Sequence, residues 1–269
     1  MPLTFAPVSG LLAGLGLLRI EVADAVAHVR LNRPAKRNAL NDGIILAIQD
    51  CFSNLPEGTG AVVIHGVGDH FSSGLDLSEL TEHDATEGLR HSQMWHRVFD
   101  RIQYSRVPVI AALKGAVIGG GLELACAAHI RVAEPSAYFA LPEGQRGIFV
   151  GGGGSVRLPR LIGVARMIDM MLTGRVYSAT EGSAYGFSQY LTEAGGALPK
   201  ALELAERVAA NAPLTNFAVL QALPMIAEAN PQAGLLMESL MATVAQSDKE
   251  AKRRIRAFLD HKTAKVKPT

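Results

Sequence analysis

Two short runs near the start of the chain, residues 17–22 and 26–31, are rich in apolar residues that partly alternate with polar ones. Residues 23–25, Ala-Asp-Ala, separate these runs, and this spacing is typical of two antiparallel strands joined by a tight turn. A third run, residues 61–65 (Ala-Val-Val-Ile-His), is β-branched and follows a glycine, which predicts a buried strand. The sequence therefore predicts a sheet that begins with a hairpin.

A second kind of pattern starts at Asn41, where apolar residues recur at helical spacing until residues 54–60 introduce turn-forming residues. Further along, two more predicted strands, residues 109–113 and 130–133, flank a predicted helix at residues 122–128. Strands that alternate with helices in this way indicate an α/β fold in which helices cover a largely parallel sheet.

The pattern changes again in the last quarter of the chain, where strand-like runs end and Ala, Leu and Met become frequent. Three helices are predicted there, over residues 202–211, 214–228 and 234–258, the last interrupted near Ser247. A chain of 269 residues exceeds the usual single domain of roughly 100 to 200 residues. We therefore expect a core domain with the functional site over residues 1–200, and a helical region over residues 201–269.

Charge and cysteine content narrow the possible partners. Lys plus Arg number 26 and Asp plus Glu number 25, so no global positive field attracts nucleic acid or an anionic membrane. The two cysteines cannot build a multi-disulfide framework, which favours a reducing, cytoplasmic environment. The eight histidines are scattered without ligand spacing, and no metal site is expected.

The N-terminal apolar stretch, residues 8–18, lacks a preceding basic residue and is broken by glycines. A signal peptide needs a basic residue before its apolar run, and a membrane span needs about 20 apolar residues. We expect this stretch to be a loose segment that leads into the first strand.

A glycine triplet, residues 119–121, stands immediately before the apolar helix predicted at residues 122–128. Consecutive glycines let the backbone approach a ligand closely and expose N–H groups, a geometry suited to an oxyanion or a phosphate. Glu123 follows among apolar neighbours, where the helix N-terminus offsets only about 0.3 to 1 kcal/mol of the cost of burying a carboxylate. This cost favours a functional role for Glu123 over simple tight packing.

A second carboxylate, Glu143, lies between Pro142 and Gly144, which restrict its backbone. By itself this arrangement is typical of a surface turn. The four glycines at residues 151–154 then open another predicted helix and supply further N–H donors. The segment contains no Walker lysine, so the nucleotide-phosphate motif is not met.

The loop Phe-Ser-Ser-Gly-Leu-Asp-Leu, residues 71–77, follows the predicted buried strand and offers one more backbone N–H. Together with residues 119–121, it provides two glycine turns that can place two amides on one carbonyl oxygen. This design stabilises an enolate.

Four segments in this order resemble the crotonase superfamily over nearly the whole chain. They are residues 31–41 (LNRPAKRNALN), 71–77 (FSSGLDL), 119–124 (GGGLEL) and 140–144 (ALPEG). The resemblance implies a crotonase-like spiral of ββα units. It also implies a helical C-terminal trimerisation region, with homotrimers that can pair into hexamers.

Within that superfamily, the resemblance implies that the amides of Leu75 and Gly120 form the oxyanion hole for a thioester carbonyl. Hydratases carry glutamates at both positions matched by Glu123 and Glu143, whereas isomerases generally retain one. Glu123 would deprotonate the water that attacks C3, Glu143 would protonate C2, and the Gly151 amide would help to hold the water. Leu75 stands where hydratases commonly have alanine, which puts a bulkier side chain near the thioester.

The resemblance also assigns positions to coenzyme A, which is part of the substrate, so that no separate cofactor is expected. The implied CoA-binding residues are Arg33, Lys36, Arg37, Ser73, Asp76, Leu77 and Lys262. A neighbouring subunit often lends the residue matched by Lys262. The alternative for the basic residues is an ordinary solvated charged loop. Trp95, in the predicted helical region 87–104, matches the lining of the acyl pocket, although a tryptophan in a helix is more often part of the core.

The sequence thus predicts an enoyl-CoA hydratase that adds water across the 2,3 double bond of an acyl-CoA thioester. Residues 138–160 also resemble the methylthioacryloyl-CoA hydratases, which hydrate their substrate and then release CoA by thioester hydrolysis. Three other functions stay open: a Δ3,Δ2-enoyl-CoA isomerase, a CoA thioester hydrolase, and a non-catalytic acyl-CoA-binding protein. We expect an acyl-CoA substrate and a homotrimer or hexamer, without nucleic-acid or membrane partners.

Overall fold

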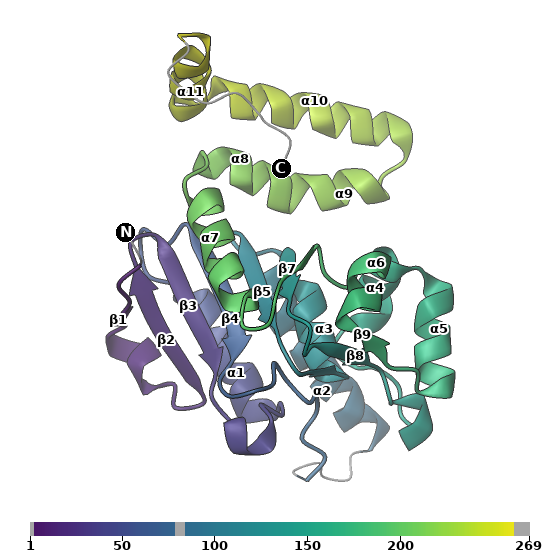
Figure 1. The fold of residues 1–269 in the computed structure, drawn as a ribbon. Coiled ribbons are helices and arrows are strands. Elements are labelled where there is room, and N and C mark those ends of the chain that lie inside the picture. The colour runs from purple at the N-terminus through teal and green to yellow at the C-terminus, as the bar shows by residue number, and fades with distance from the viewer. Residues whose placement is uncertain (1–2, 79–83, 261–269) are drawn as a thin grey trace. The chain divides into compact units, whose positions relative to one another are not determined.

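Within residues 3–78 and 84–260, which the computed structural model describes, a seven-stranded sheet forms the centre of the first unit (Figure 1). Its strands in spatial order are β1 (Ala6–Pro7), β2 (Leu18–Ala23), β3 (Val26–Leu31), β4 (Ala61–Gly66), β5 (Val109–Leu113), β7 (Ile130–Ala133) and β10 (Tyr190–Leu191). β1, β2 and β3 pair antiparallel, and every later pair is parallel. The predicted hairpin and the largely parallel sheet are therefore both confirmed.

Helices cover both faces of this sheet because its strands are apolar on both sides. One core lies between the sheet and three helices, α1 (Asp42–Ser53), α2 (Ala85–Gln103) and α3 (Gly120–Ala127). The other core lies beneath α7 (Ala197–Ala209), which places Ala201, Leu204 and Ala205 against the strands. Small side chains on α7 allow the helix to approach the sheet closely.

Capping explains where two of these helices begin. The Asn41 side chain accepts a hydrogen bond from the amide of Ile44 at the start of α1. At the start of α2, Asp84 and Glu87 form a reciprocal capping box. Both segments were predicted as helices, and their ends agree with the prediction to within a few residues.

A second, smaller sheet was not predicted. Its strands are β6 (Ala116–Ile118), β8 (Tyr138–Ala140) and β9 (Tyr177–Ser178), with β6 parallel to β8. In the chain, α4 (Gly154–Ile162) and α5 (Val164–Thr173) lie between β8 and β9, and α6 (Ala179–Tyr185) follows β9. Strands of two or three residues carry too little periodicity to be recognised in a sequence.

The first unit ends at Ala209, and the second starts at Ala210. The predicted boundary at residue 200 lies too early, because α7 packs on β4, β5 and β7 and so belongs with the sheet. The second unit contains α8 (Pro213–Phe217), a π-helical turn (Ala218–Ala222), α9 (Leu223–Glu228), α10 (Pro231–Ser247) and α11 (Lys249–Leu259).

The second unit is helical, as predicted, but one of its helices is interrupted. Residues 214–228 do not form a continuous α-helix, because a π-helical turn precedes Pro224. Proline has no N–H to donate to the preceding turn, so the regular hydrogen-bond ladder cannot pass through it. The interruption predicted near Ser247 is confirmed by the break between α10 and α11. Each helix in the described part of the chain is too short or too polar to cross a lipid bilayer.

Two buried histidines lie on the face of the sheet that α7 covers. His28 on β3 and His65 on β4 are 6% and 7% exposed, and their rings stack with centroids 4.7 Å apart. The His65 Nδ1 lies 3.0 Å from the Gly66 carbonyl oxygen, so this nitrogen carries the proton and donates. Burial lowers the pKa of His28 to about 4 and that of His65 to about 3, with a further contribution from the charge of Arg30. Both rings are therefore neutral at pH 7.

The histidine pair predicts that the free energy of unfolding falls as the pH is lowered from about 6.5 towards 4. Over this range the unfolded chain binds protons on both histidines while the folded protein does not. Each histidine then contributes up to about 1.4 kcal/mol of lost stability per pH unit. Urea unfolding, followed by Trp95 fluorescence from pH 7 to pH 5, measures this slope. The variant His28→Leu/His65→Leu should have a shallower slope, and an unchanged slope would contradict the prediction.

Candidate active site

The short strand β6 brings together three segments that lie far apart in the sequence. On one side, β6 pairs with β8 so that Ile118 lies opposite Ala140, and the Gly119 amide donates to the Ala140 carbonyl at 3.0 Å. On the other side, the Ser72 amide donates to the Ala116 carbonyl, and the Ile118 amide donates to the Ser72 carbonyl. The loops that follow Ser72, β6 and β8 therefore emerge at the same edge.

Glu123 reaches this edge from the first turn of α3. Its side chain is 4% exposed, and its Oε1 accepts hydrogen bonds from the amides of Gly152 at 2.8 Å and Gly154 at 2.7 Å. Burial raises the pKa of Glu123, whereas these two amides and the positive charge of Arg157 act in the opposite direction. The carboxylate is thus held by one oxygen in a site that excludes most water.

Glu143 reaches the same edge from the loop after β8. It is 7% exposed, and its Oε2 has no hydrogen-bond partner among the described residues. Burial, followed by the charge of Glu123, raises the pKa of Glu143 to about 7, although its own backbone amide and Arg146 lower it. At neutral pH this side chain is therefore protonated in a large fraction of molecules and can act as an acid.

Two backbone amides, those of Leu75 and Gly120, lie close together beside the glutamates: a Cβ on Gly120 would lie 3.6 Å from the Leu75 nitrogen. Gly120 is the first residue of α3, so its N–H has no carbonyl to reach within the helix. Leu75 forms an isolated bridge with Leu40, in which the Gly74 carbonyl and the Asp76 amide make the hydrogen bonds. This pairing directs the Leu75 amide away from Leu40. Together the two amides can accommodate one carbonyl oxygen.

Glycine is required where this backbone approaches its neighbours. Gly119 has a φ of 51°, which L side chains rarely adopt, and a Cβ there would lie 2.7 Å from Oε1 of Glu143. A Cβ on Gly120 would lie 2.9 Å from Trp95. The glycine triplet recognised in the sequence is therefore explained by close approach to the glutamate and to the tryptophan.

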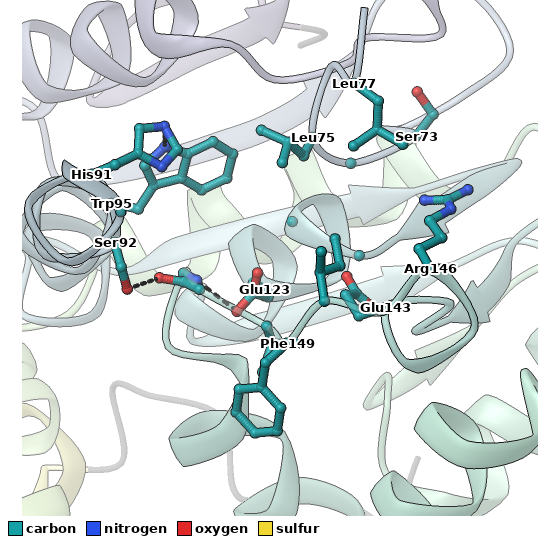
Figure 2. A pocket seen from close by; sticks show the side chains of 18 residues that line it. Ser73, Leu75, Leu77, His91, Ser92, Trp95, Glu123, Glu143, Arg146 and Phe149 are labelled. Atoms are coloured by element: carbon teal, nitrogen blue, oxygen red, sulfur yellow. Dashed lines mark hydrogen bonds between the residues drawn. The ribbon is translucent and has the colours of Figure 1, made fainter. Parts of the chain in front are cut away.

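These groups line a cavity of ≈ 380 Å³, shown in Figure 2. All five residues predicted to be catalytic line it: Leu75, Gly120, Glu123, Glu143 and Gly151. Apolar side chains complete the wall, among them Trp95, Ile148 and Phe149. The cavity thus places two carboxyl groups and two backbone amides beside an apolar space.

The residues predicted to bind CoA lie in different places in the structure. Ser73 and Leu77 line the cavity. Asp76 is instead buried next to the first loop, where its Oδ2 lies 2.9 Å from Nη2 of Arg33 and 3.4 Å from Nζ of Lys36. These two cations are engaged by the protein itself.

Two further residues of the predicted CoA site have other positions. Arg37 is exposed in a left-handed conformation, with a φ of 50°. Lys262 lies outside the described residues.

Sequence reasoning missed several residues of the cavity. His91 and Ser92 on α2, and Arg146 after Glu143, line it as well. Arg157 on α4 supports it from behind: Nη1 donates to the Gly152 carbonyl at 2.9 Å, and the same guanidinium binds Asp100 and Gln103. No local motif marks Ser92 or Arg157. Ser92 acts through Gly151 and Arg157 through Asp100, and each of these partners is more than 50 residues away in the chain.

Chemically, the site can hold a carbonyl oxygen, remove a proton at one carboxylate and deliver a proton from another. Among the described residues, no group of three His, Cys, Asp or Glu side chains is arranged to hold a metal ion. The described groups can support acid/base chemistry at carbons next to a carbonyl group whose oxygen the two amides hold.

Comparisons with known proteins relate the chain to one family. The sequence profile of the family described as enoyl-CoA hydratase/isomerase matches residues 21–268. The 2,3-dehydroadipyl-CoA hydratase of Escherichia coli (strain K12) is 34% identical over 246 residues, which cover 90% of this chain and 95% of that protein.

Two crystal structures are also similar. A candidate enoyl-CoA hydratase from Rhodopseudomonas palustris CGA009 is 77% identical, with a TM-score of 0.91, and the match covers 96% of this chain and 100% of that one. The enoyl-CoA hydratase from Bacillus anthracis is 30% identical, with a TM-score of 0.85, covering 91% and 96%.

The position of Arg157 predicts that Arg157→Lys lowers the free energy of unfolding by about 1 to 3 kcal/mol. A single ammonium group cannot reach Asp100, Gln103 and the buried Gly152 carbonyl at once, so at least one of these acceptors loses its donor. Urea unfolding followed by Trp95 fluorescence measures the change. Arg160→Lys, on the exposed side of the same helix, is the matched control and should cost clearly less. Equal losses in both variants would argue against the supporting role of Arg157.

Proposed function

The chain belongs to the enoyl-CoA hydratase/isomerase family, and we propose that it is an enoyl-CoA hydratase, which adds water across the 2,3 double bond of an acyl-CoA thioester. The observation that carries this proposal is that Glu123 and Glu143 line one cavity. Hydration needs one group to take a proton from water and another to give a proton to carbon. An isomerase needs only one group that shuttles a proton.

In the proposed mechanism, the thioester carbonyl oxygen lies between the amides of Leu75 and Gly120. The Glu123 carboxylate takes a proton from a water molecule held near the Gly151 amide, and the resulting hydroxide oxygen bonds to C3. Electrons of the double bond move onto the thioester oxygen, where the two amides stabilise the enolate. The protonated Glu143 then gives its proton to C2, and the carbonyl reforms.

The two glutamates suit these roles for different physical reasons. Burial raises the pKa of Glu123, and two amide donors and the charge of Arg157 oppose this rise by stabilising the carboxylate form that a base needs. Among the described residues no donor reaches Oε2 of Glu143, and its pKa, which burial raises to about 7, keeps much of it protonated. After one turnover Glu123 holds the proton that Glu143 has lost, and exchange with solvent restores both groups.

For the CoA moiety we propose contacts with Ser73 and Leu77, which line the cavity, and with the exposed Arg37. Arg33 and Lys36 would contribute by ordering the loop through their ion pairs with Asp76. Lys262 keeps its predicted role as a residue lent by a neighbouring subunit.

We further propose that the protein assembles as a homotrimer or a hexamer through its second unit. Leu235, Leu236 and Leu240 on α10 are between 58% and 64% exposed, and Ile255 and Phe258 on α11 are more than half exposed. Apolar groups at this density on two adjacent helices are typical of surfaces that a partner covers.

The substrate class is tested by turnover of crotonyl-CoA beside methylthioacryloyl-CoA, following both loss of the enoyl-thioester absorbance and release of free thiol. We expect absorbance loss with crotonyl-CoA and no thiol. Thiol release with the sulfur substrate alone would instead support a hydratase that also hydrolyses the thioester, which the resemblance of residues 138–160 favours. CoA binding without either signal would overturn the proposed function.

The roles of the glutamates predict that Glu123→Gln and Glu143→Gln each lower kcat for hydration by at least about 10², the lower range for general acid/base help. CoA affinity should change little, because the amide side chains keep the shape of the cavity. Stopped-flow absorbance and equilibrium CoA binding measure the two quantities. Glu206→Gln, exposed on α7, is the matched control and should behave as the unmodified protein. Near-normal turnover in either site variant would rule out the assigned role.

A further inference from the structure

The peptide bonds that donate to Glu123 are themselves hydrogen-bonded at their carbonyl ends. The Gly152 amide and the Gly151 carbonyl belong to one peptide group, and the Ser92 Oγ donates to that carbonyl at 2.7 Å. Figure 2 shows the two dashed lines that join Ser92 to Glu123 through this peptide. Ser92 is therefore connected to the carboxylate by a continuous chain of two hydrogen bonds.

The second peptide group that holds Glu123 is anchored differently. Its Gly154 amide donates to Glu123, and its Gly153 carbonyl accepts from the backbone amides of Val156 and Arg157, both at 3.1 Å. These contacts are part of the start of α4. Of the two peptide groups, only the one between Gly151 and Gly152 has its carbonyl held by a side chain, among the described residues.

We propose that Ser92 is a positioning residue for Glu123 and acts through the peptide group between Gly151 and Gly152. The inference rests on the proposed function, in which Glu123 is the base. A donor on the carbonyl end of a peptide polarises it and strengthens its N–H as a donor. It also fixes the peptide plane, so that Glu123 keeps Oε1 on the amides and Oε2 available for water.

This arrangement connects Ser92 to the protonation of Glu123. The charged and titratable groups that face this carboxylate are Arg157 from α4, Glu143 from the loop after β8, and Cys126 from α3. His96, one turn along α2, lies 3.4 Å from the Ser92 Oγ. All of these remain when Ser92 is replaced by alanine, so a changed pH profile reports the lost hydrogen bond.

The test compares Ser92→Ala with Ser92→Thr, which keeps the hydroxyl group. We expect Ser92→Ala to lower kcat for crotonyl-CoA hydration about tenfold, the worth of one hydrogen bond to a critical group. KM should change less than about twofold, because binding of the substrate is retained. The acidic limb of the kcat profile should move to higher pH, since Glu123 then holds its proton more tightly. Ser92→Thr should restore most of the activity and the original limb.

The matched control is Ser53→Ala on α1, where an exposed serine hydroxyl likewise donates to a backbone carbonyl, that of Gln49, at 2.7 Å. It should leave kcat and the pH profile unchanged. A loss in Ser92→Ala that affects only KM, that is equal at every pH, or that Ser92→Thr does not restore would overturn the proposal.

A second measurement separates this proposal from the proposed function. ¹³C NMR of carboxyl-labelled glutamate, assigned with Glu123→Gln, follows the Glu123 titration without any turnover. We expect its pKa to be higher in Ser92→Ala than in the unmodified protein. An unchanged pKa would overturn the role of Ser92 even if the enzyme is a hydratase, whereas a raised pKa without hydration would overturn only the proposed function.

Discussion

The buried carboxylate of Glu123 is the constraint on which the site depends. A carboxylate that is 4% exposed is costly unless donors replace the water it has lost. Two glycine amides supply those donors, and glycine is needed there because a Cβ on Gly154 would lie 2.8 Å from Glu123 Cγ. The glycine loop contacts the carboxylate directly, and Ser92 and the guanidinium of Arg157 in turn hold the carbonyl groups of that loop.

The pairing of β6 determines which groups lie next to the Glu123 carboxylate. With β8 on one side and Ser72 on the other, β6 aligns the loops that carry Glu143, Gly120 and Leu75. Its three residues are hydrogen-bonded on both sides but contribute little surface of their own. The larger sheet, with cores on both faces, provides the rigid support that this small sheet lacks.

Much of the fold could be predicted because its signals are local. The hairpin, the buried strand at Ala61 and the start of α1 follow from the period of apolar residues and from a capping asparagine. The α/β fold of the crotonase superfamily followed from four motifs, and the matched structures agree with it.

What could not be predicted depends on contacts between distant segments. The second sheet consists of strands too short to show a period, and the end of the first unit is decided by the packing of α7 on the main sheet.

In the site, the glycine motifs marked the backbone donors and both glutamates. Ser92 and Arg157 carry no such mark, since a serine or an arginine on an amphipathic helix is ordinary until its partner is known. The ion pairs of Asp76 with Arg33 and Lys36 could not be predicted either, because these residues match the positions of a ligand site. Among the described residues, all those that line the cavity fall between Ser73 and Gly152, so the two glutamates, the two amides and the apolar wall come from one stretch of a single chain. A single copy of the chain therefore brings these cavity groups together, and the described helices of the second unit can diverge in sequence without replacing any residue of the cavity wall.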